Sequence, residues 1–275
     1  MKKEERLTLK VYSKNPMYEW KRLFQDPFHR LEFDTTMYFL KQYLPKKGLI
    51  LDAGGGPGRY TMELAKLGYD VVLLDFTPEN LELARKQIKK AKVEDKVKDI
   101  VEGSIVDLSR YEDNTFDAVV CLGGPLSHVH NEKARQKAVA ELRRVAKPNS
   151  PIAISVMGKF AVIMAAPKSW IHEYNNRKHA SDITFRGEDY MWHGKYYCHF
   201  FERDEFENLV KGSKINIQEL IGLEGLASSD SDGFNNMPKK YPKAHKNWME
   251  FHYKLCRHPT VVDTSMHMMI LGRKR

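Results

Sequence analysis

Short apolar runs alternate along the chain with longer segments of helical period, starting at Gly48. The apolar runs have the length of strands, and the segments between them carry apolar residues every three or four positions. This alternation is typical of βαβ units, in which helices join parallel strands across the faces of a sheet. The pattern therefore predicts an α/β fold. We expect strands at residues 49–53, 70–75, 97–102, 116–122, 152–157, 215–223 and 266–272.

Helices are expected between these strands, where start and stop residues frame the apolar periodicity. Thr77-Pro78-Glu79 combines an N-cap, a proline at the first helical position and an early acid. Gly68 and Pro148 are suited to end the helices that precede them. The pattern predicts helices at residues 59–67, 78–91, 131–146 and 204–211.

Three regions depart from the alternation. Residues 1–45 contain two amphipathic stretches, which we expect to form helices packed over the carboxyl-terminal edge of the sheet. Residues 158–201 hold ten aromatic residues among many polar ones, which predicts an inserted cap, and residues 228–246 are predicted to form a polar loop. The expected organisation is an N-terminal helical segment (1–45), a core (46–157), an aromatic insertion (158–201) and a final core segment (202–275).

Composition limits the class of protein. No run approaches the roughly 18 apolar residues of a membrane helix, and the N-terminus has no apolar stretch typical of a signal peptide. Cys121, Cys198 and Cys256 lie far apart, which predicts neither a disulfide framework nor a thiolate zinc site and favours a cytoplasmic protein. The net charge of +9 favours an acidic partner such as RNA, but the basic residues are scattered as on solvated helix faces.

The most informative stretch is Leu49 to Tyr60, in which an apolar strand ends in an acid and a glycine cluster opens a helix. Glycines let a ligand lie against the backbone, and the helix N-terminus offers unpaired N–H donors. A dinucleotide fingerprint is disfavoured because neither Gly54 nor Gly55 starts a G-x-G-x-x-G run. A phosphate-binding P-loop is excluded because no Gly-Lys-Ser/Thr follows.

The spacing acid-x-Gly-x-Gly-x-Gly closely resembles motif I of the class I S-adenosylmethionine-dependent methyltransferases. The resemblance continues at Asp75, which occupies the place of the family's ribose-binding acid, and at Phe76, where a side chain commonly packs on adenine. Residues 101–108 match the segment that reads the adenine edge, although the usual aspartate is replaced by serine. The cofactor-binding residues that the resemblance implies are Asp52, Gly54, Gly55, Gly56, Gly58, Asp75, Phe76, Ser104, Ile105, Asp107 and Leu122, with the roles of Ser104 and Asp107 left open.

The resemblance covers roughly residues 46–157 and 199–275 and is to the small-molecule branch, which includes quinone-biosynthesis C-methyltransferases. It implies a Rossmann-like, seven-stranded sheet with an antiparallel last strand and helices on both faces. It also implies S-adenosylmethionine as cofactor and S-adenosylhomocysteine as product. The expected reaction is an SN2 methyl transfer to a small-molecule acceptor.

Methyl transfer asks little of the protein beyond aligning the acceptor and excluding water. If the acceptor must lose a proton, His128 is the best-placed general base, near the exit of the fourth strand. Tyr18, Tyr190 and His193 are further candidates for substrate contact, and Tyr12 is a candidate to close over the cofactor. No metal site is expected, because His128 and His130 have no carboxylate or thiolate cluster beside them.

The acceptor class stays open at this point. Leu122-Gly123-Gly124-Pro125 differs from the Asn/Asp-Pro-Pro-aromatic run of methyltransferases that act on base amino groups, and Cys121 does not match the cysteine of a cytosine-C5 enzyme. The aromatic insertion suits a pocket for a planar or apolar small molecule. The alternatives are a methyltransferase acting on RNA or protein, and a catalytically inactive module that binds S-adenosylmethionine.

Overall fold

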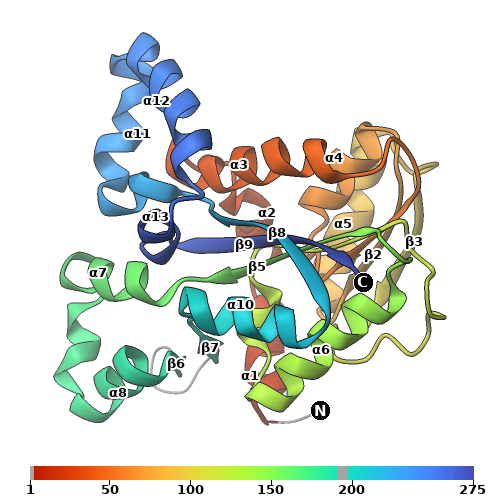
Figure 1. Ribbon diagram of the computed structural model, residues 1–275, viewed down its shortest axis with the longest axis horizontal. Helices are drawn as coiled ribbons and strands as arrows, with labels where there is room; N and C mark the ends of the chain where they lie inside the picture. The colour runs from red at the N-terminus through yellow and green to blue at the C-terminus, as the bar shows by residue number, and fades with distance from the viewer. Residues whose placement is uncertain (1–2, 191–196) are drawn as a thin grey trace.

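A single sheet organises the fold in the computed structural model, which describes residues 3–190 and 197–275. Within these ranges seven strands pair in the order β3-β2-β1-β4-β5-β9-β8 (Figure 1). β9 is antiparallel to both of its neighbours, β5 and β8, whereas the other pairings in the sheet are parallel. The predicted α/β sheet with an antiparallel last strand is confirmed. Its strands are β1 Leu49–Ala53, β2 Asp70–Asp75, β3 Val97–Glu102, β4 Ala118–Cys121, β5 Pro151–Met157, β8 Ile215–Gly222 and β9 His267–Lys274.

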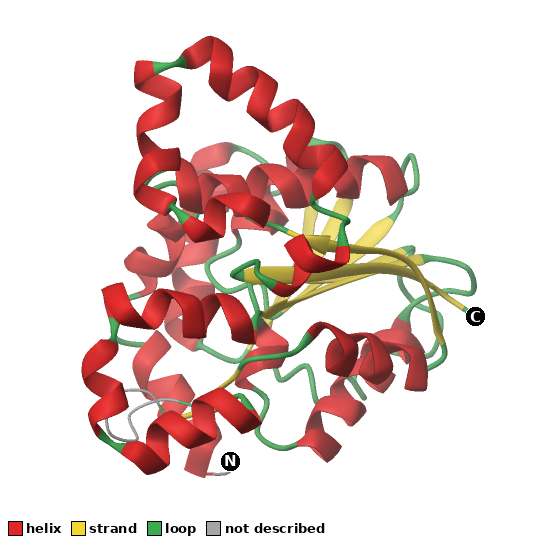
Figure 2. Ribbon diagram, turned by 60° about the vertical axis from the view of Figure 1, so that its left-hand side comes forward, coloured by secondary structure: helices red, strands yellow, loops and turns green. Residues whose placement is uncertain are grey.

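Helices cover both faces of this sheet (Figures 1 and 2). One face packs against α3 (Pro27–Tyr43), α4 (Arg59–Lys66) and α5 (Pro78–Ala91), with side chains such as Phe39, Leu64 and Ile88 buried against the strands. The other face packs against α6 (Glu132–Val145) and α10 (Arg203–Gly212). Both faces of the central strands are thus buried, which explains why those strands are apolar throughout.

The strand order creates the place where a ligand can bind. β1 lies between β2 and β4, so the chain leaves the carboxyl ends of β1 and β4 toward opposite sides of the sheet. In open α/β sheets, a crevice forms at such a switch point, outside the carboxyl ends of the strands. The glycine cluster after β1 lies at this position.

The N-terminal segment forms three helices rather than two amphipathic stretches: α1 (Lys3–Tyr12), α2 (Pro16–Arg22) and α3. Asn15 and Asp26 cap α2 and α3, each by accepting a hydrogen bond from a backbone N–H three residues on. Side chains of α1 and α2 lie near the carboxyl ends of β1, β2 and β4, as expected. The expectation was wrong for α3, which packs across a sheet face because its apolar side is broad enough to enter the main core.

The prediction of a polar loop at residues 228–246 is also wrong. The structure has η4 (Gly225–Ser229) followed by a helical pair, α11 (Ser231–Lys240) and α12 (Pro242–Leu255), which projects from the sheet (Figure 1). Asp230 caps α11, and Phe234 packs with Trp248 and with Phe28 of α3 in a small separate core. The many lysines in this region hid the few apolar residues that hold the pair in place. α13 (Pro259–Asp263) then leads into β9.

The insertion at 158–201 is largely helical where it is described. It comprises α7 (Lys159–Ser169), η2 (Ile171–Asn175), α8 (Arg177–Ser181), η3 (Asp182–Arg186) and the short antiparallel pair β6 (Glu188–Asp189) and β7 (Cys198–His199). Val162, Ile183 and Phe200 form a core of its own. The insertion therefore has its own packing, beside the main sheet.

Two expectations from composition can be compared with the structure. In the described part of the chain, no helix is long and apolar enough to cross a bilayer. Cys121, Cys198 and Cys256 are all buried and unbonded to one another, as their spacing predicted.

Candidate active site

A cavity of about 620 Å³ lies at the carboxyl ends of β1, β2 and β4. Its walls come from the glycine turn after β1, the residues after β2 and β3, the η1 turn (Pro125–His128) after β4, and side chains of α1 and α2. A volume of this size is within the range of small-molecule sites. The cavity therefore lies where a switch-point crevice is expected, and two helices of the N-terminal segment form part of its wall.

The glycine turn gives the cavity its floor. Gly56 lines the cavity with a φ of +56°, and a Cβ at this position would meet only Asn80 Nδ2, at 3.8 Å, so a side chain would extend into open space. Gly58 is needed for packing instead, because a Cβ there would lie 3.2 Å from Ala84 Cβ and would keep α4 away from α5. One glycine thus leaves room for a ligand and the other permits helix packing.

Asp52 lies beneath this turn and does not line the cavity. Its side chain is fully buried and accepts a hydrogen bond of 2.6 Å from Thr61 Oγ1 of α4. Burial raises the pKa of Asp52 to about 6. A Cβ at Gly55 would lie 2.5 Å from the Asp52 carboxylate, so this acid and the turn are packed directly against each other.

Asp75 lies at the end of β2 and faces the cavity. Its two carboxylate oxygens accept hydrogen bonds of 2.9 Å from the backbone N–H groups of Gly56 and Thr77. Burial raises the pKa of Asp75 although these hydrogen bonds oppose the rise. Because each carboxylate oxygen has a second lone pair, the same group can accept hydrogen bonds from a ligand's hydroxyls.

The remaining predicted cofactor residues divide into two groups. Gly54, Gly55, Phe76, Ser104, Ile105 and Leu122 line the cavity. Asp107 does not line the cavity. Its exposed carboxylate instead accepts a hydrogen bond from Ser109 N at 3.1 Å. Of the two residues left open for reading an adenine edge, the structure thus brings only Ser104 to the cavity wall.

His128 lines the cavity from the η1 turn after β4 and is held from two sides. Its Nδ1 lies 3.0 Å from the Tyr197 carbonyl oxygen, and because a carbonyl can only accept, Nδ1 carries the proton. Nε2 is then the acceptor for the Tyr12 hydroxyl, at 2.9 Å. Burial lowers the pKa of His128 to about 4, with Arg22 adding to the effect. The imidazole is therefore neutral at pH 7, with its basic nitrogen directed at Tyr12.

Arg22 of α2 brings a permanent positive charge to the cavity wall. Its guanidinium makes two hydrogen bonds to the buried Glu32 of α3, at 2.6 and 3.2 Å. A Cβ at Gly123 would lie 3.4 Å from Arg22 Nη2, which places the guanidinium beside the turn after β4. Such a fork-to-fork pair fixes the orientation of the guanidinium while leaving other N–H donors for a ligand.

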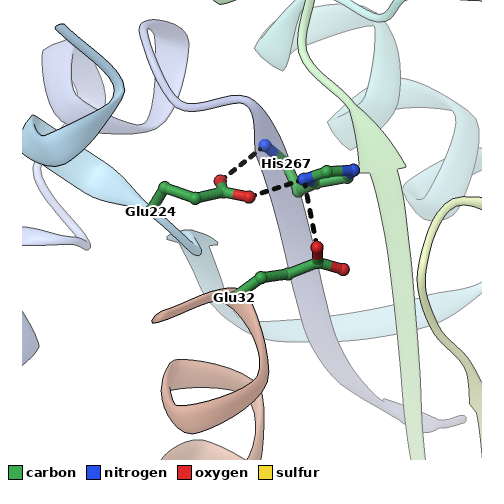
Figure 3. A group of neighbouring side chains, drawn as sticks. All are labelled: Glu32, Glu224 and His267. Carbon is green, nitrogen blue, oxygen red and sulfur yellow. Dashed lines mark hydrogen bonds and ion pairs between the residues drawn. The ribbon is translucent and has the colours of Figure 1, made fainter. Parts of the chain in front are cut away.

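The Glu32 carboxylate is the start of a buried charge network (Figure 3). His267 Nδ1 lies 3.6 Å from Glu32 and 2.6 Å from Glu224, and the backbone N–H of His267 also donates to Glu224. Burial opposes charge on His267, but Glu32 and Glu224 raise its pKa. The Glu32 carboxylate thus lies between Arg22 and His267, and Glu19 adds a second carboxylate 3.7 Å from Arg22 Nε, so these groups together hold Arg22 in place.

The predicted substrate residues are less close to the cavity. Tyr18 is about half exposed and does not line it. Tyr190 lies outside the cavity wall as well, although its hydroxyl is 3.3 Å from Nε2 of the cavity residue His130. His193 falls outside the described residues. Among those that are described, residues of the insertion do not line the cavity but contact His128 and His130 from behind.

Sequence reasoning missed several cavity residues, namely Thr8, Glu19, Arg22, Arg59 and Asn80. A signal existed for Arg59, because a cation at the start of a helix is unusual. The structure explains it: the Arg59 guanidinium stacks on Trp20 at 3.5 Å from the ring centre and donates to its carbonyl oxygen. This contact ties α2 to the glycine turn. Arg22 and Glu19 carried no signal, since nothing local indicates which face of a short helix meets the cavity.

Comparison with known proteins agrees with this geometry. Residues 50–149 match a family model described as a methyltransferase domain. The chain is 32% identical over 108 residues to a glycine/sarcosine N-methyltransferase of Aphanothece halophytica, covering 39% of each chain. It is 29% identical over 199 residues to a ubiquinone biosynthesis O-methyltransferase of Xanthomonas campestris, covering 72% of this chain and 75% of the relative. A solved S-adenosylmethionine-dependent methyltransferase of Methanosarcina mazei shares the fold, with a TM-score of 0.59 at 20% identity over 86% of this chain and 96% of its own.

The sheet order and the glycine cavity define a Rossmann-like methyltransferase fold. Residues 50–149 thus match the methyltransferase-domain family, and the chain shares the fold of solved S-adenosylmethionine-dependent methyltransferases. S-adenosylmethionine is the cofactor of this family. The chain spans only about two fifths of the length of the glycine/sarcosine N-methyltransferases that it matches, so the similarity to them is confined to that part.

Proposed function

We propose that this chain transfers a methyl group from S-adenosylmethionine to a small-molecule acceptor inside the cavity. The observation that carries the proposal is the arrangement of the cavity itself. The same cavity is lined by a glycine turn with a buried acid beside it and by a neutral, hydrogen-bonded histidine. These are the two parts that a methyltransferase for a proton-bearing acceptor needs.

The cofactor half of the cavity is assigned to the β1, β2 and β3 turns. Asp75 would accept hydrogen bonds from the ribose hydroxyls, and Phe76, Ser104 and Ile105 would surround the adenine. Asp52 would act by supporting the turn from beneath. The Arg22 guanidinium would bind the carboxylate of the cofactor's amino-acid group. When bound, S-adenosylmethionine supplies a methyl group already activated by its sulfonium.

The acceptor half is assigned to Tyr12 and His128. Tyr12 Oη would take the proton from the acceptor's O–H or N–H as its own proton passes to His128 Nε2. The Tyr197 carbonyl holds Nδ1–H, so the imidazole receives the proton in a fixed orientation. The charges balance, because the imidazolium forms as the sulfonium charge is lost to a neutral thioether. The low pKa of His128 keeps the imidazole unprotonated throughout the neutral range.

The acceptor class follows from the size and chemistry of this half. Cavity walls of Tyr12, His128 and His130 suit a compact molecule with a hydroxyl or amine. The names of the relatives support the same class, since they include enzymes of glycine/sarcosine and ubiquinone-biosynthesis methylation. We place the reaction in the cytoplasm, because three unpaired cysteines are typical of proteins from a reducing compartment.

The experiment is an acceptor screen that records S-adenosylhomocysteine release and product mass. Small amines that carry a carboxylate, small phenols and catechols, and total tRNA form three separate arms. The purified chain is compared with His128→Gln, and with His258→Gln as a control that removes an exposed histidine. Methylation of a small amine or phenol that falls with His128→Gln alone supports the proposal.

Two outcomes would overturn it. Methylation confined to the tRNA arm would replace the small molecule by a nucleic acid. Binding of S-adenosylhomocysteine without turnover in any of the three arms would indicate an inactive cofactor-binding module.

A further inference from the structure

Two groups of carboxylates and a histidine converge in the described part of the chain, and they differ in how their charge is balanced. The first is the network of Glu32, Glu224 and His267 in Figure 3. Arg22 donates twice to Glu32, and Ser265 Oγ donates to Glu224 at 3.0 Å. Protein groups already satisfy this cluster, so it has no need of an ion.

The second group lies in the insertion and combines Glu173 of η2, His179 of α8 and Asp189 of β6. His179 Nε2 lies 2.9 Å from Glu173 Oε2 and 3.4 Å from Asp189 Oδ1, and the three atoms lie within 4.8 Å of one another. Ligands of a tetrahedral Zn²⁺ lie at about 2.0–2.2 Å from the metal, which puts neighbouring donor atoms at roughly 3.3 Å from each other. The three atoms therefore already have nearly the spacing of one face of such a site.

The negative charge of the two carboxylates in this second group is not balanced by neighbouring residues in the described part of the chain. The Glu173 and Asp189 side chains are only 10% and 4% exposed, and both carboxylates pair with His179 and with no lysine or arginine in the ranges that are described. Asp189 Oδ1 is buried and makes no hydrogen bond, yet it points at His179. Burial and the nearby Glu173 raise the pKa of Asp189 to about 7. Two poorly exposed carboxylates that share one imidazole carry excess negative charge, which a divalent cation would neutralise.

We propose that Glu173, His179 and Asp189 bind a divalent transition metal ion, for which Zn²⁺ is the appropriate probe. Imidazole together with carboxylates favours Zn²⁺ or a related first-row ion over Mg²⁺ and Ca²⁺, which prefer oxygen donors alone. None of the three residues lines the methyltransferase cavity, so the ion would not take part in methyl transfer. It would instead join η2, α8 and β6 and stabilise the fold of the insertion.

A third group, between the insertion and α10, provides a matched control. His199 also lies between two carboxylates, but its Nδ1 faces Glu188 at 3.2 Å and its Nε2 faces Glu205 at 2.7 Å. The two carboxylates are therefore on opposite edges of the ring and cannot meet at one ion. Glu205→Gln removes a carboxylate beside a buried histidine while leaving the proposed site intact.

The test uses the full chain without an affinity tag, stripped with a chelator and then titrated calorimetrically with Zn²⁺ and, separately, with Mg²⁺. We expect one Zn²⁺ per chain, no measurable Mg²⁺ binding, and Zn²⁺ affinity at least about tenfold lower in Asp189→Asn and in Glu173→Gln. Glu205→Gln should bind Zn²⁺ like the parent. Zn²⁺ should also raise the thermal midpoint of the parent and of Glu205→Gln, but not of the two ligand variants.

Asp189→Asn has nearly the shape of the protonated acid, and Glu173→Gln provides a second variant if the first does not fold. Absence of one-to-one Zn²⁺ binding by the parent would overturn the proposal. Equal affinity of the parent and either folded ligand variant would overturn it as well, because the ion would then be held elsewhere on the chain. Neither result depends on methyltransferase activity, so the proposed function would be unaffected.

Discussion

The two halves of the cavity are built in different ways. The cofactor half consists of turns that directly follow β1, β2 and β3, and glycines form part of its lining. The acceptor half consists of side chains brought together from distant parts of the chain, as in the contact between Tyr12 and His128, 116 residues apart. The first depends on local backbone geometry and the second on tertiary packing.

This difference has a chemical counterpart. A cofactor shared by a whole family can be bound by the backbone, which varies little with sequence. Each acceptor needs its own side chains, and the N-terminal helices and the η1 turn supply them without altering the sheet. Substitutions in the two halves should therefore separate cofactor binding from turnover.

The largest effect is expected for Gly56→Val. The valine would take a φ of +56°, which is strained for a β-branched residue by roughly 1–3 kcal/mol, and its side chain would enter the cavity. We expect S-adenosylhomocysteine binding to weaken by more than about 100-fold in a calorimetric titration. Gly68→Val is the control, because Gly68 has a φ of +96° but open space around it and lies outside the cavity. Equal weakening in both variants would show that strain alone is responsible.

His128→Gln should separate the two halves most clearly. Removing a general base lowers turnover by about 10²- to 10⁴-fold. Because His128 is assigned to the acceptor and not to the cofactor, cofactor affinity should change by less than about threefold. Steady-state kinetics with an accepted substrate and calorimetry on the same preparation provide the comparison. Turnover at the parental rate would remove His128 from the reaction.

Asp75→Ala should weaken cofactor binding by about 1–3 kcal/mol, because the ribose loses its acceptor and the Gly56 and Thr77 N–H groups lose theirs. Asp70→Ala, at the other end of β2, removes a partly exposed acid paired with Lys96 and Lys98 and should leave affinity unchanged. Calorimetry with S-adenosylhomocysteine measures both. If the two variants bind alike, the assignment of the ribose site is wrong.

The pH dependence of turnover tests the environment of His128. Burial lowers its pKa to about 4 from an ordinary value near 6.5, so the ring stays neutral and basic until the pH falls well below 5. At pH 5.5 a histidine of ordinary pKa would be only about 9% neutral, whereas one of pKa about 4 would be about 97% neutral. We therefore expect kcat to be nearly constant between pH 5.5 and 8. A tenfold fall between pH 7 and 5.5 would contradict the buried environment.

The same contrast explains what sequence could predict. Apolar runs and capping residues predicted the strands and the helices between them, because those elements are set by local periodicity. Asp75 and the glycine turn could be assigned from their spacing, since both lie next to a strand end. Arg22 could not, because its position depends on a bidentate contact with Glu32 on another helix. The α11–α12 pair was missed for a related reason: Phe234 packs against Trp248 of the neighbouring helix and against Phe28 of the distant α3.

The most direct test of the cofactor site is calorimetric titration of the purified chain with S-adenosylhomocysteine, with NAD as a control. We expect one-to-one binding in the micromolar range and no binding of NAD, since the turn lacks a dinucleotide fingerprint. Absence of S-adenosylhomocysteine binding, or equal binding of NAD, would contradict the assignment of the cavity.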